Sequence, residues 1–311
     1  MKLVFCGTPR FAVPTLEALV AASHEVAMVA AQPDRPVGRT QEMTAPPVKQ
    51  AALAAGLAVT QPEKIRHNEE FRARLTEIAP DAIVVVAYGR IIPPWMLELP
   101  RLGCINLHAS LLPKYRGAAP IQWAVAEGEA ETGNTTMLLE EGLDTGPILL
   151  QEPVAIEPEQ TAAELFDALA AKGAPLVVET LAGLERGTIT PRRQEDANAT
   201  LAPILTREDG RMDFAARTAE ELRNRWRGFQ PWPGVFTSWQ GKKLIVHRLM
   251  VAEGNGEAEP GTVHVDGARL LAACAKGTWL ELMEVQLEGK RRMPAAEFLR
   301  GAQIGASARL G

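Results

Sequence analysis

The sequence predicts an α/β protein, in which a Rossmann-like, mostly parallel sheet with flanking helices is followed by a small C-terminal β-barrel of the OB-like type. Up to about residue 190, short β-type runs alternate with helical patterns, which is the rhythm of βαβ units. Continuous apolar runs such as residues 83–87 suit strands covered on both faces, as parallel strands are. Beyond residue 210, short β-like segments separated by Gly-rich turns indicate a small barrel.

The elements of the first part follow in order along the chain. Residues 2–7, 25–32, 81–88 and 104–108 read as strands, and residues 13–22, 48–55 and 71–79 read as helices. Residues 135–156 read as two strands around a loop. Residues 162–187 read as a helical stretch that the Gly-Ala-Pro at 173–175 can interrupt and that Gly187 closes.

A weakly patterned, polar segment separates the two parts. Residues 188–210 are rich in turn formers, as a linker wrapped over a surface would be. We therefore expect a first domain at 1–190, a linker at 191–209 and a second domain at 210–311. The second domain is predicted to begin with a helix at about 215–226 and to continue with strands in 235–240, 243–251, 261–267, 268–277 and 278–286.

Composition limits the class of protein. The three cysteines lie far apart with no metal-ligand spacing, so neither a disulfide framework nor a metal site is expected. The short apolar run at the start is too brief for a signal peptide, and no run of about 18 apolar residues is present, so we expect a soluble, cytoplasmic protein.

Charge is unevenly distributed along the chain. Residues 1–190 hold 15 Lys and Arg against 23 Asp and Glu, a net charge of −8, whereas residues 191–311 hold 18 against 15, a net charge of +3. The basic second part permits a polyanionic partner. Lys242, Lys243 and Arg248 are the candidates for a phosphate-facing stripe on the barrel, joined by the GKRR run at 289–292.

The run CINLH places an asparagine and a histidine two residues apart at the end of a predicted strand. In an extended chain such residues project from the same face, about 6.6 Å apart, so Asn106 and His108 can meet one substrate. The carboxyl edge of an open α/β sheet is where such folds bind ligands. From the spacing alone, a capping Asn106 and a solvated strand-end His108 are an equally good interpretation.

A third polar group, Asp144, lies in the glycine-bearing loop EEGLDTGP. Alone, this aspartate is more typical of a turn than of a catalyst. Together, however, an amide, an imidazole and a carboxylate suit acyl transfer to an amine. The amide stabilises an oxyanion, the imidazole moves protons and the carboxylate orients the imidazole. No serine or cysteine nucleophile is needed if the donor already carries an activated acyl group.

Several longer motifs resemble a known family. The stretch NLHASLLPKYRGAAPIQWA, together with VFCGTPRFA, QPDRPVGR, VVVAYGRIIP, TGNTTMLLEEGLDTGPIL and GFQPWPG, resembles the folate-dependent formyltransferases over nearly the full length. The PIQWA and PWPG segments are similar to those of the tRNA-directed members. The resemblance implies transfer of a formyl group from 10-formyltetrahydrofolate to the α-amino group of methionyl initiator tRNA.

The resemblance also implies roles for residues. Asn106, His108 and Asp144 become the catalytic trio, and no metal is implied. The folate site is implied at a loop and at a backbone segment, with the lining residues Ser110, Leu111, Leu112, Pro113, Val86, Ala87, Tyr88, Gly89 and Ile91. The loop at 34–49 resembles the segment that enters the tRNA acceptor arm, and Arg39 matches its key arginine. Thr40, Gln41 and Glu42 follow where bacterial relatives often carry lysines.

Other functions fit the sequence less well. A nicotinamide oxidoreductase is disfavoured because Pro9 stands where a dinucleotide turn needs its second glycine. A non-catalytic RNA-binding protein would leave the Asn, His and Asp grouping without a use. Within the family, the alternative is a nucleotide-sugar N-formyltransferase with the same donor, against which the basic second domain argues. A monomer is the expected state.

Overall fold

The computed structural model describes residues 1–38, 41–254, 256–302, 304–305 and 308–311, and the chain forms two compact units. The first unit comprises Met1–Pro120, Glu131–Ala155 and Leu165–Pro203, and the second comprises Ile121–Ala130, Ile156–Glu164 and Ile204–Gly311. Two short segments from the predicted first domain therefore belong to the second unit.

A central sheet organises the first unit, with the strand order β10-β9-β7-β6-β1-β2-β5. The strands from β7 to β5 pair in parallel, whereas β9 and β10 add an antiparallel edge. The predicted α/β class is thereby confirmed. The strands are β1 (Lys2–Gly7), β2 (Glu25–Ala30), β5 (Val59–Thr60), β6 (Ala82–Val86), β7 (Cys104–His108), β9 (Glu131–Leu138) and β10 (Ile148–Ala155).

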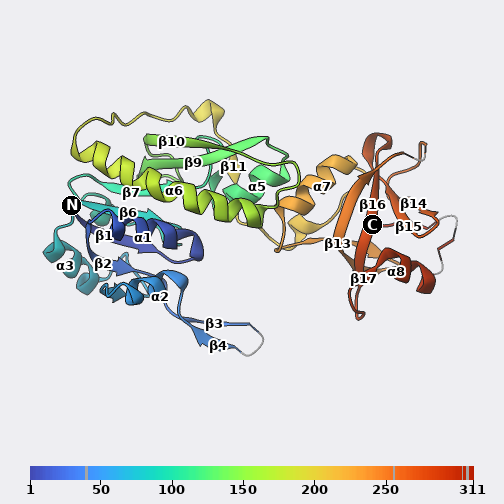
Figure 1. Cartoon of the computed structure of the whole chain (residues 1–311), viewed down its shortest axis with the longest axis horizontal. Helices are drawn as coiled ribbons and strands as arrows, with labels where there is room; N and C mark the ends of the chain where they lie inside the picture. Colours follow the sequence, from blue (N-terminus) through green and yellow to red (C-terminus); the bar gives the residue numbers. More distant parts are fainter. Residues whose placement is uncertain (39–40, 255, 303, 306–307) are drawn as a thin grey trace. The chain divides into compact units, whose positions relative to one another are not determined.

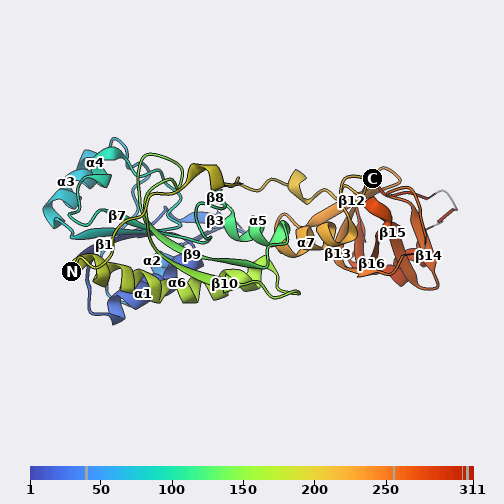
Figure 2. The same ribbon diagram turned by 90° about the horizontal axis from the view of Figure 1, so that it is seen from above.

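Helices cover both faces of this sheet, as Figure 2 shows, with α3 and α4 on one face and α1 and α6 on the other. Phe11 packs edge-to-face on Phe166 of α6 on one side, and Phe71 packs in the same way on Trp95 on the other. Two covered faces explain why β6 is buried along its whole length. The helices are η1 (Arg10–Ala12), α1 (Val13–Ala21), α2 (Pro47–Ala54), α3 (Glu69–Ile78), α4 (Pro94–Leu97) and α6 (Ala162–Glu185).

The helix α6 runs without interruption through Gly173 and Pro175, where the sequence left room for a break. A Cβ on Gly173 would lie 2.6 Å from a methyl of Leu107, so only a glycine lets the helix approach β7 this closely. This packing offsets the hydrogen bond that the proline cannot donate.

The predicted 34–49 loop contains a small hairpin of β3 (Arg35–Val37) and β4 (Glu42–Thr44), which projects from the sheet in Figure 1. Its two ends are joined because Lys49 Nζ lies 2.8 Å from Asp34 Oδ2. Gln61 also donates to Asp34 Oδ1, over 2.7 Å.

The segment predicted as a linker carries β11 (Leu201–Ala202), η2 (Asp196–Asn198) and η3 (Glu208–Gly210). The strand β11 pairs in parallel with β8 (Arg116–Gly117), directly after the loop that follows β7. A Cβ on Gly117 would lie 2.5 Å from the carbonyl oxygen of Ala202, so this close pairing requires a glycine. The linker is thus bound to the first unit along this stretch.

The second unit is built on an antiparallel sheet with the order β12-β13-β16-β15-β14, to which β17 adds beside β16. The last residues bridge its two edges, since Leu310 pairs with Trp239 and Arg309 pairs with Thr262. All the strands predicted here are present: β12 (Val235–Trp239), β13 (Lys242–Ala252), β14 (Val263–Asp266), β15 (Arg269–Ala273) and β16 (Trp279–Leu287), with β17 (Met293–Pro294), η4 (Ala275–Gly277) and α8 (Ala295–Gly301) completing the sheet unit.

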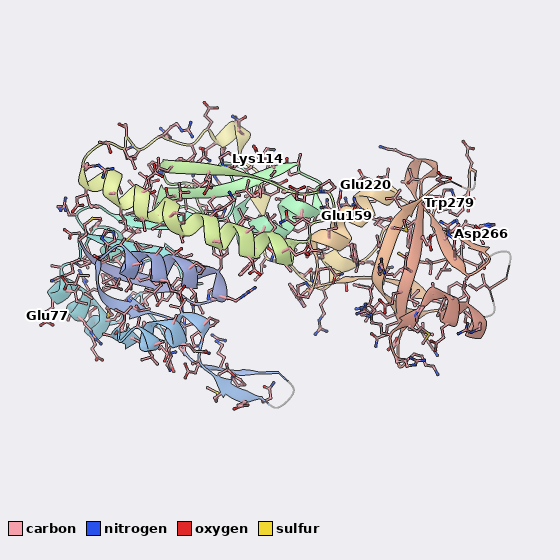
Figure 3. The ribbon with its side chains drawn as sticks, viewed as in Figure 1. Glu77, Lys114, Glu159, Glu220, Asp266 and Trp279 are labelled. Atoms are coloured by element: carbon pink, nitrogen blue, oxygen red, sulfur yellow. The ribbon has the colours of Figure 1, made fainter. Side chains whose placement is uncertain are left out.

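The second unit also contains α5 (Pro120–Ala126) and α7 (Ala219–Gly228). The latter begins four residues later than predicted, because Thr218 and Glu221 form a capping box there. The guanidinium of Arg225 packs against the edge-to-face pair of Trp123 and Phe229, 5.5 and 4.8 Å from the ring centroids. Figure 3 labels Glu159 and Glu220, which lie near each other and both pair with Arg223.

Candidate active site

The carboxyl end of β7 carries two of the predicted catalytic side chains. This strand lies between β6 and β9, and Asn106 is opposite Val85 on one side and Met137 on the other. Because β7 is extended through His108, Asn106 and His108 project from the same face as the spacing predicts. Within the described part of the chain, no hydrogen bond engages the half-buried Asn106 amide.

The imidazole of His108 is buried, with 6% of the residue exposed, and each ring nitrogen faces an oxygen. Its Nε2 lies 2.9 Å from the carbonyl oxygen of Tyr115, and its Nδ1 lies 3.7 Å from Asp144 Oδ2. A carbonyl oxygen only accepts, so Nε2 carries a proton and donates it to Tyr115. Nδ1 is then the nitrogen able to take up a further proton, on the side that faces the carboxylate.

The position of the Asp144 carboxylate depends on a backbone hydrogen bond and on the backbone conformation of Asp144 itself. Its Oδ2 accepts a hydrogen bond of 2.8 Å from the Gly117 N–H. The residue has a φ of 52°, in the left-handed region that aspartate tolerates better than most residues. This conformation is also common for aspartates in turns, so the case for a catalytic Asp144 rests on its position facing His108.

The loop after β7, predicted to line the folate site, is tied to β9. Thr135 Oγ1 donates to the Ser110 carbonyl over 2.6 Å and accepts from the Leu112 N–H over 3.1 Å. Ser110 and Leu112 are buried, and the Ser110 hydroxyl donates to the carbonyl of Lys114, which is labelled in Figure 3. Leu111 and Pro113 are half-buried and so retain surface for a ligand.

The second predicted folate segment follows β6, the strand next to β7. Val86 and Tyr88 are buried, whereas Ala87 and Gly89 are exposed and have positive φ values of 46° and 76°. Ile91 is 90% exposed, so its apolar surface is accessible to a ligand. Two hydrogen bonds hold the backbone of this segment, since Gln32 Nε2 donates to the carbonyls of Tyr88 and Gly89 over 3.1 Å each.

Tyr88 adds a buried polar group to this segment. Its hydroxyl is one of the buried polar atoms that have no hydrogen-bond partner in the described part of the chain. Burial raises the pKa of the phenol well above its ordinary value, so the hydroxyl stays protonated.

The predicted tRNA-contacting residues are spread over both units. Arg39 lies outside the described residues. In the second unit, Lys242, Lys243 and Arg248 are exposed on β13, and the Lys243 ammonium lies 3.7 Å from the ring centroid of Phe236. In the GKRR run, Arg291 pairs with Glu297 and Arg292 pairs with Glu284, so these two charges are partly neutralised.

Sequence reasoning missed two residues next to the site, Arg116 and Gln194. Both are buried, and the guanidinium of Arg116 donates to Gln194 Oε1 over 3.0 and 2.8 Å. Gln194 comes from the turn-rich linker, where no apolar periodicity marks a buried residue. Backbone pairing on both sides of Gln194 brings it to the site, through the bridge between Arg192 and Ile148 before it and the pairing of β11 with β8 after it.

Neither a metal site nor a membrane-spanning helix is found among the described residues. Across them, no three His, Cys, Asp or Glu side chains gather closely enough to hold a metal ion. No helix among them is long and apolar enough to cross a membrane.

Comparisons with known proteins agree along the full chain. A family model described as formyl transferase matches residues 1–181, and one described as formyl transferase, C-terminal domain, matches residues 204–303. The methionyl-tRNA formyltransferase of Acidobacterium capsulatum is 67% identical over 311 residues, covering 100% of both chains. That of Koribacter versatilis is 57% identical over 311 residues, covering 100% of this chain and 99% of the relative.

A solved structure is similar in fold. It is a sugar 3N-formyl transferase, crystallised in the presence of dTDP and 5-N-formyl-THF. The TM-score is 0.66 at 16% identity, over 94% of this chain and 99% of that chain. At this identity the likeness shows a shared fold.

Proposed function

The chain belongs to the formyl transferase family and, within it, to the methionyl-tRNA formyltransferases, and on this premise we propose how its own residues carry out the reaction. It transfers the formyl group of 10-formyltetrahydrofolate to the α-amino group of methionyl initiator tRNA, a step of translation initiation. The observation that carries this function is the 67% identity to such an enzyme over the whole length of both chains.

The catalytic trio of the proposal is Asn106, His108 and Asp144. The folate supplies an activated formyl group on its nitrogen. The Asn106 amide, which no hydrogen bond engages in the described part of the chain, donates to the formyl oxygen as negative charge develops there. His108 faces Asp144 through Nδ1, 3.7 Å away, and moves the proton that the attacking amine loses.

The bonds and protons balance in this scheme. The amine nitrogen forms a bond to the formyl carbon, and the bond between that carbon and the folate nitrogen breaks. The proton lost by the amine passes to the departing folate nitrogen, with His108 Nδ1 as its carrier. Asp144 stabilises the imidazole while it is positively charged, as carboxylates do for catalytic histidines.

The donor is proposed to bind where the segments after β6 and β7 meet the carboxyl edge of the sheet. Adjacent parallel strands bring Val86, Ala87, Tyr88, Gly89 and Ile91 beside the loop of Ser110, Leu111, Leu112 and Pro113. Exposed backbone at Ala87 and Gly89 offers hydrogen bonds to a flat heterocycle. The exposed Ile91 offers apolar surface against it.

The acceptor is proposed to contact both units. In the 34–49 loop, the proposed contact is Arg39. On β13, the proposed contacts are Lys242, Lys243 and Arg248. Exposed cations suit phosphate binding, because the counterions that they displace from the nucleic acid add to the affinity. We propose that the protein acts as a monomer in the cytoplasm.

An acceptor competition tests the function. The purified chain is given 10-formyltetrahydrofolate with methionyl initiator tRNA, uncharged tRNA, glycinamide ribonucleotide or a UDP-amino sugar, and release of tetrahydrofolate is measured. We expect turnover with methionyl initiator tRNA alone. Turnover with the amino sugar and none with the tRNA would replace the proposal with a nucleotide-sugar N-formyltransferase.

A further inference from the structure

The side chain of Gln194 joins the two segments that hold the predicted catalytic aspartate. Gln194 is 6% exposed and uses both ends of its amide. Its oxygen accepts from Arg116 over 3.0 and 2.8 Å, and its nitrogen donates to the carbonyls of Asp144 and Gly146 over 2.8 Å each. The amide is therefore saturated, and its orientation is fixed by its partners.

The partners of Gln194 are close in sequence to the two ends of the hydrogen bond that holds the Asp144 carboxylate. Arg116 directly precedes Gly117, whose N–H donates to Asp144 Oδ2 over 2.8 Å. The other end of Gln194 binds the backbone of Asp144 itself, which is in the left-handed conformation. Gln194 thus sets the distance between the group that holds the carboxylate and the chain that carries it.

Arg116 has a second partner that does not reach the aspartate. Its Nη2 lies 2.9 Å from Asp196 Oδ1, but Asp196 is exposed, with 75% of its side chain accessible. Solvent screens the exposed Asp196 carboxylate, whereas a buried and fully bonded amide restricts its neighbours strongly. Among the two linker side chains on this guanidinium, Gln194 alone bonds to the Asp144 loop.

We propose that Gln194 is a positioning residue, which keeps the Asp144 carboxylate facing His108 Nδ1 and so acts on the transfer through Asp144. The inference rests on the proposed function. Gln194 touches neither reacting group in this scheme. Since a misplacement of about 1 Å can cost about 100-fold in rate, a lost tether to the Asp144 loop should appear in kcat.

The main test is Gln194→Glu, which keeps an acceptor for Arg116 but replaces the two donations to carbonyls with repulsion. We expect kcat to fall about ten- to a hundredfold with KM for both substrates within about twofold of wild type. The matched control is Asp196→Asn, on the same guanidinium, for which we expect kcat within about twofold of wild type. A Gln194→Glu enzyme that keeps more than half of its kcat, or that loses activity only through KM, would refute the proposal.

A coupling test shows whether the effect runs through Asp144. Adding Gln194→Glu to Asp144→Asn should leave kcat within about twofold of Asp144→Asn alone, because residues that act as a unit are not additive. Full additivity of the two losses would refute the proposal.

A readout independent of activity completes the design. Amide hydrogen exchange of the peptide containing Gly117 should speed up in Gln194→Glu, while peptides from the second unit keep their wild-type rates. Unchanged exchange at Gly117 would refute the tether, whereas faster exchange everywhere would show unfolding and equally reject a local role. Failure of the proposed function is seen separately, as an absence of formyl transfer by the wild-type chain.

Discussion

Both units bury arginine side chains, but the buried guanidiniums hold different things. In the first unit, Arg116 binds the side chains of Gln194 and Asp196 beside the Asp144 loop. In the second, Arg225 packs against two aromatic rings and Arg227 donates to the carbonyls of Glu157 and Gln160. Burial lowers the pKa of both second-unit arginines. We therefore expect loss of the contacts around Arg116 to change the rate, and loss of the second-unit arginines to change stability.

The largest effect expected from this contrast is on rate in the first unit. Asn106→Ala should lower kcat about 10²–10³-fold as an oxyanion donor is lost, and His108→Ala or Asp144→Ala about 10²–10⁴-fold as proton transfer fails. Melting temperatures should stay close to wild type, and His67→Ala, at an exposed histidine, serves as control. Steady-state kinetics on methionyl initiator tRNA provide the measurement. Near-normal rates in all three variants would remove the trio.

In the second unit, we expect the substitution of a buried arginine to lower the unfolding free energy. Arg225→Ala removes a guanidinium stacked on Trp123 and Phe229, and we expect a loss of about 2 kcal/mol in unfolding free energy. Arg291→Ala, at an exposed pair with Glu297, should cost within about 0.5 kcal/mol. Urea unfolding followed by tryptophan fluorescence gives both values. Equal losses in the two variants would contradict the structural role of Arg225.

A smaller effect is expected at the exposed cations of the barrel. Alanine at Lys242, Lys243 or Arg248 should weaken tRNA binding several-fold and reduce the salt slope by about 0.7–0.9 for each phosphate that is no longer neutralised. Stability should not change, since none of the three is buried. Binding isotherms at a series of salt concentrations test this, with Arg309→Ala, ion-paired with Glu259 and outside the predicted stripe, as the control. An unaltered salt slope in all three would exclude them from the interface.

The smallest effect is expected at the base of the hairpin. Hydrogen bonds from Lys49 and Gln61 hold the pKa of Asp34 below its ordinary value, so Asp34 stabilises the fold above its unfolded-state pKa. This stabilisation is lost as the pH falls through the lower, folded-state pKa. Asp34→Asn should therefore lower the melting temperature slightly at about pH 7, by an amount that shrinks as the pH falls below the ordinary pKa of an aspartate. Asp266→Asn, at an exposed pair, is the control, and a difference that grew on acidification would reverse the assignment.

Much of the fold follows from the sequence because local pattern and tertiary environment agree. The βαβ rhythm and the run CINLH predict the parallel strands, and the alternation within CINLH places Asn106 and His108 together. The five β-like segments after residue 234 are likewise present as strands. These elements are specified by their own periodicity, which needs no information from distant parts of the chain.

The features that the sequence did not predict depend on distant contacts. The antiparallel edge of β9 and β10 is set by pairing partners, which the pattern of one strand does not specify. The continuity of α6 depends on the packing of Gly173 against Leu107. Gln194 has no local signal at all, because its burial depends on the bridge between Arg192 and Ile148 and on the pairing of β11 with β8. The catalytic roles of the trio stay a prediction.

The attachment of residues 194–202 to the first unit bears on how the two halves can be recombined. The match to the formyl transferase family model ends at residue 181. That residue is therefore an obvious junction for a chimera with another acceptor-binding domain. A chimera joined there would lack Gln194 and β11. The Asp144 loop would then lose its hydrogen bonds from Gln194. We expect an active chimera to need this chain's residues through Pro203, where the first compact unit ends.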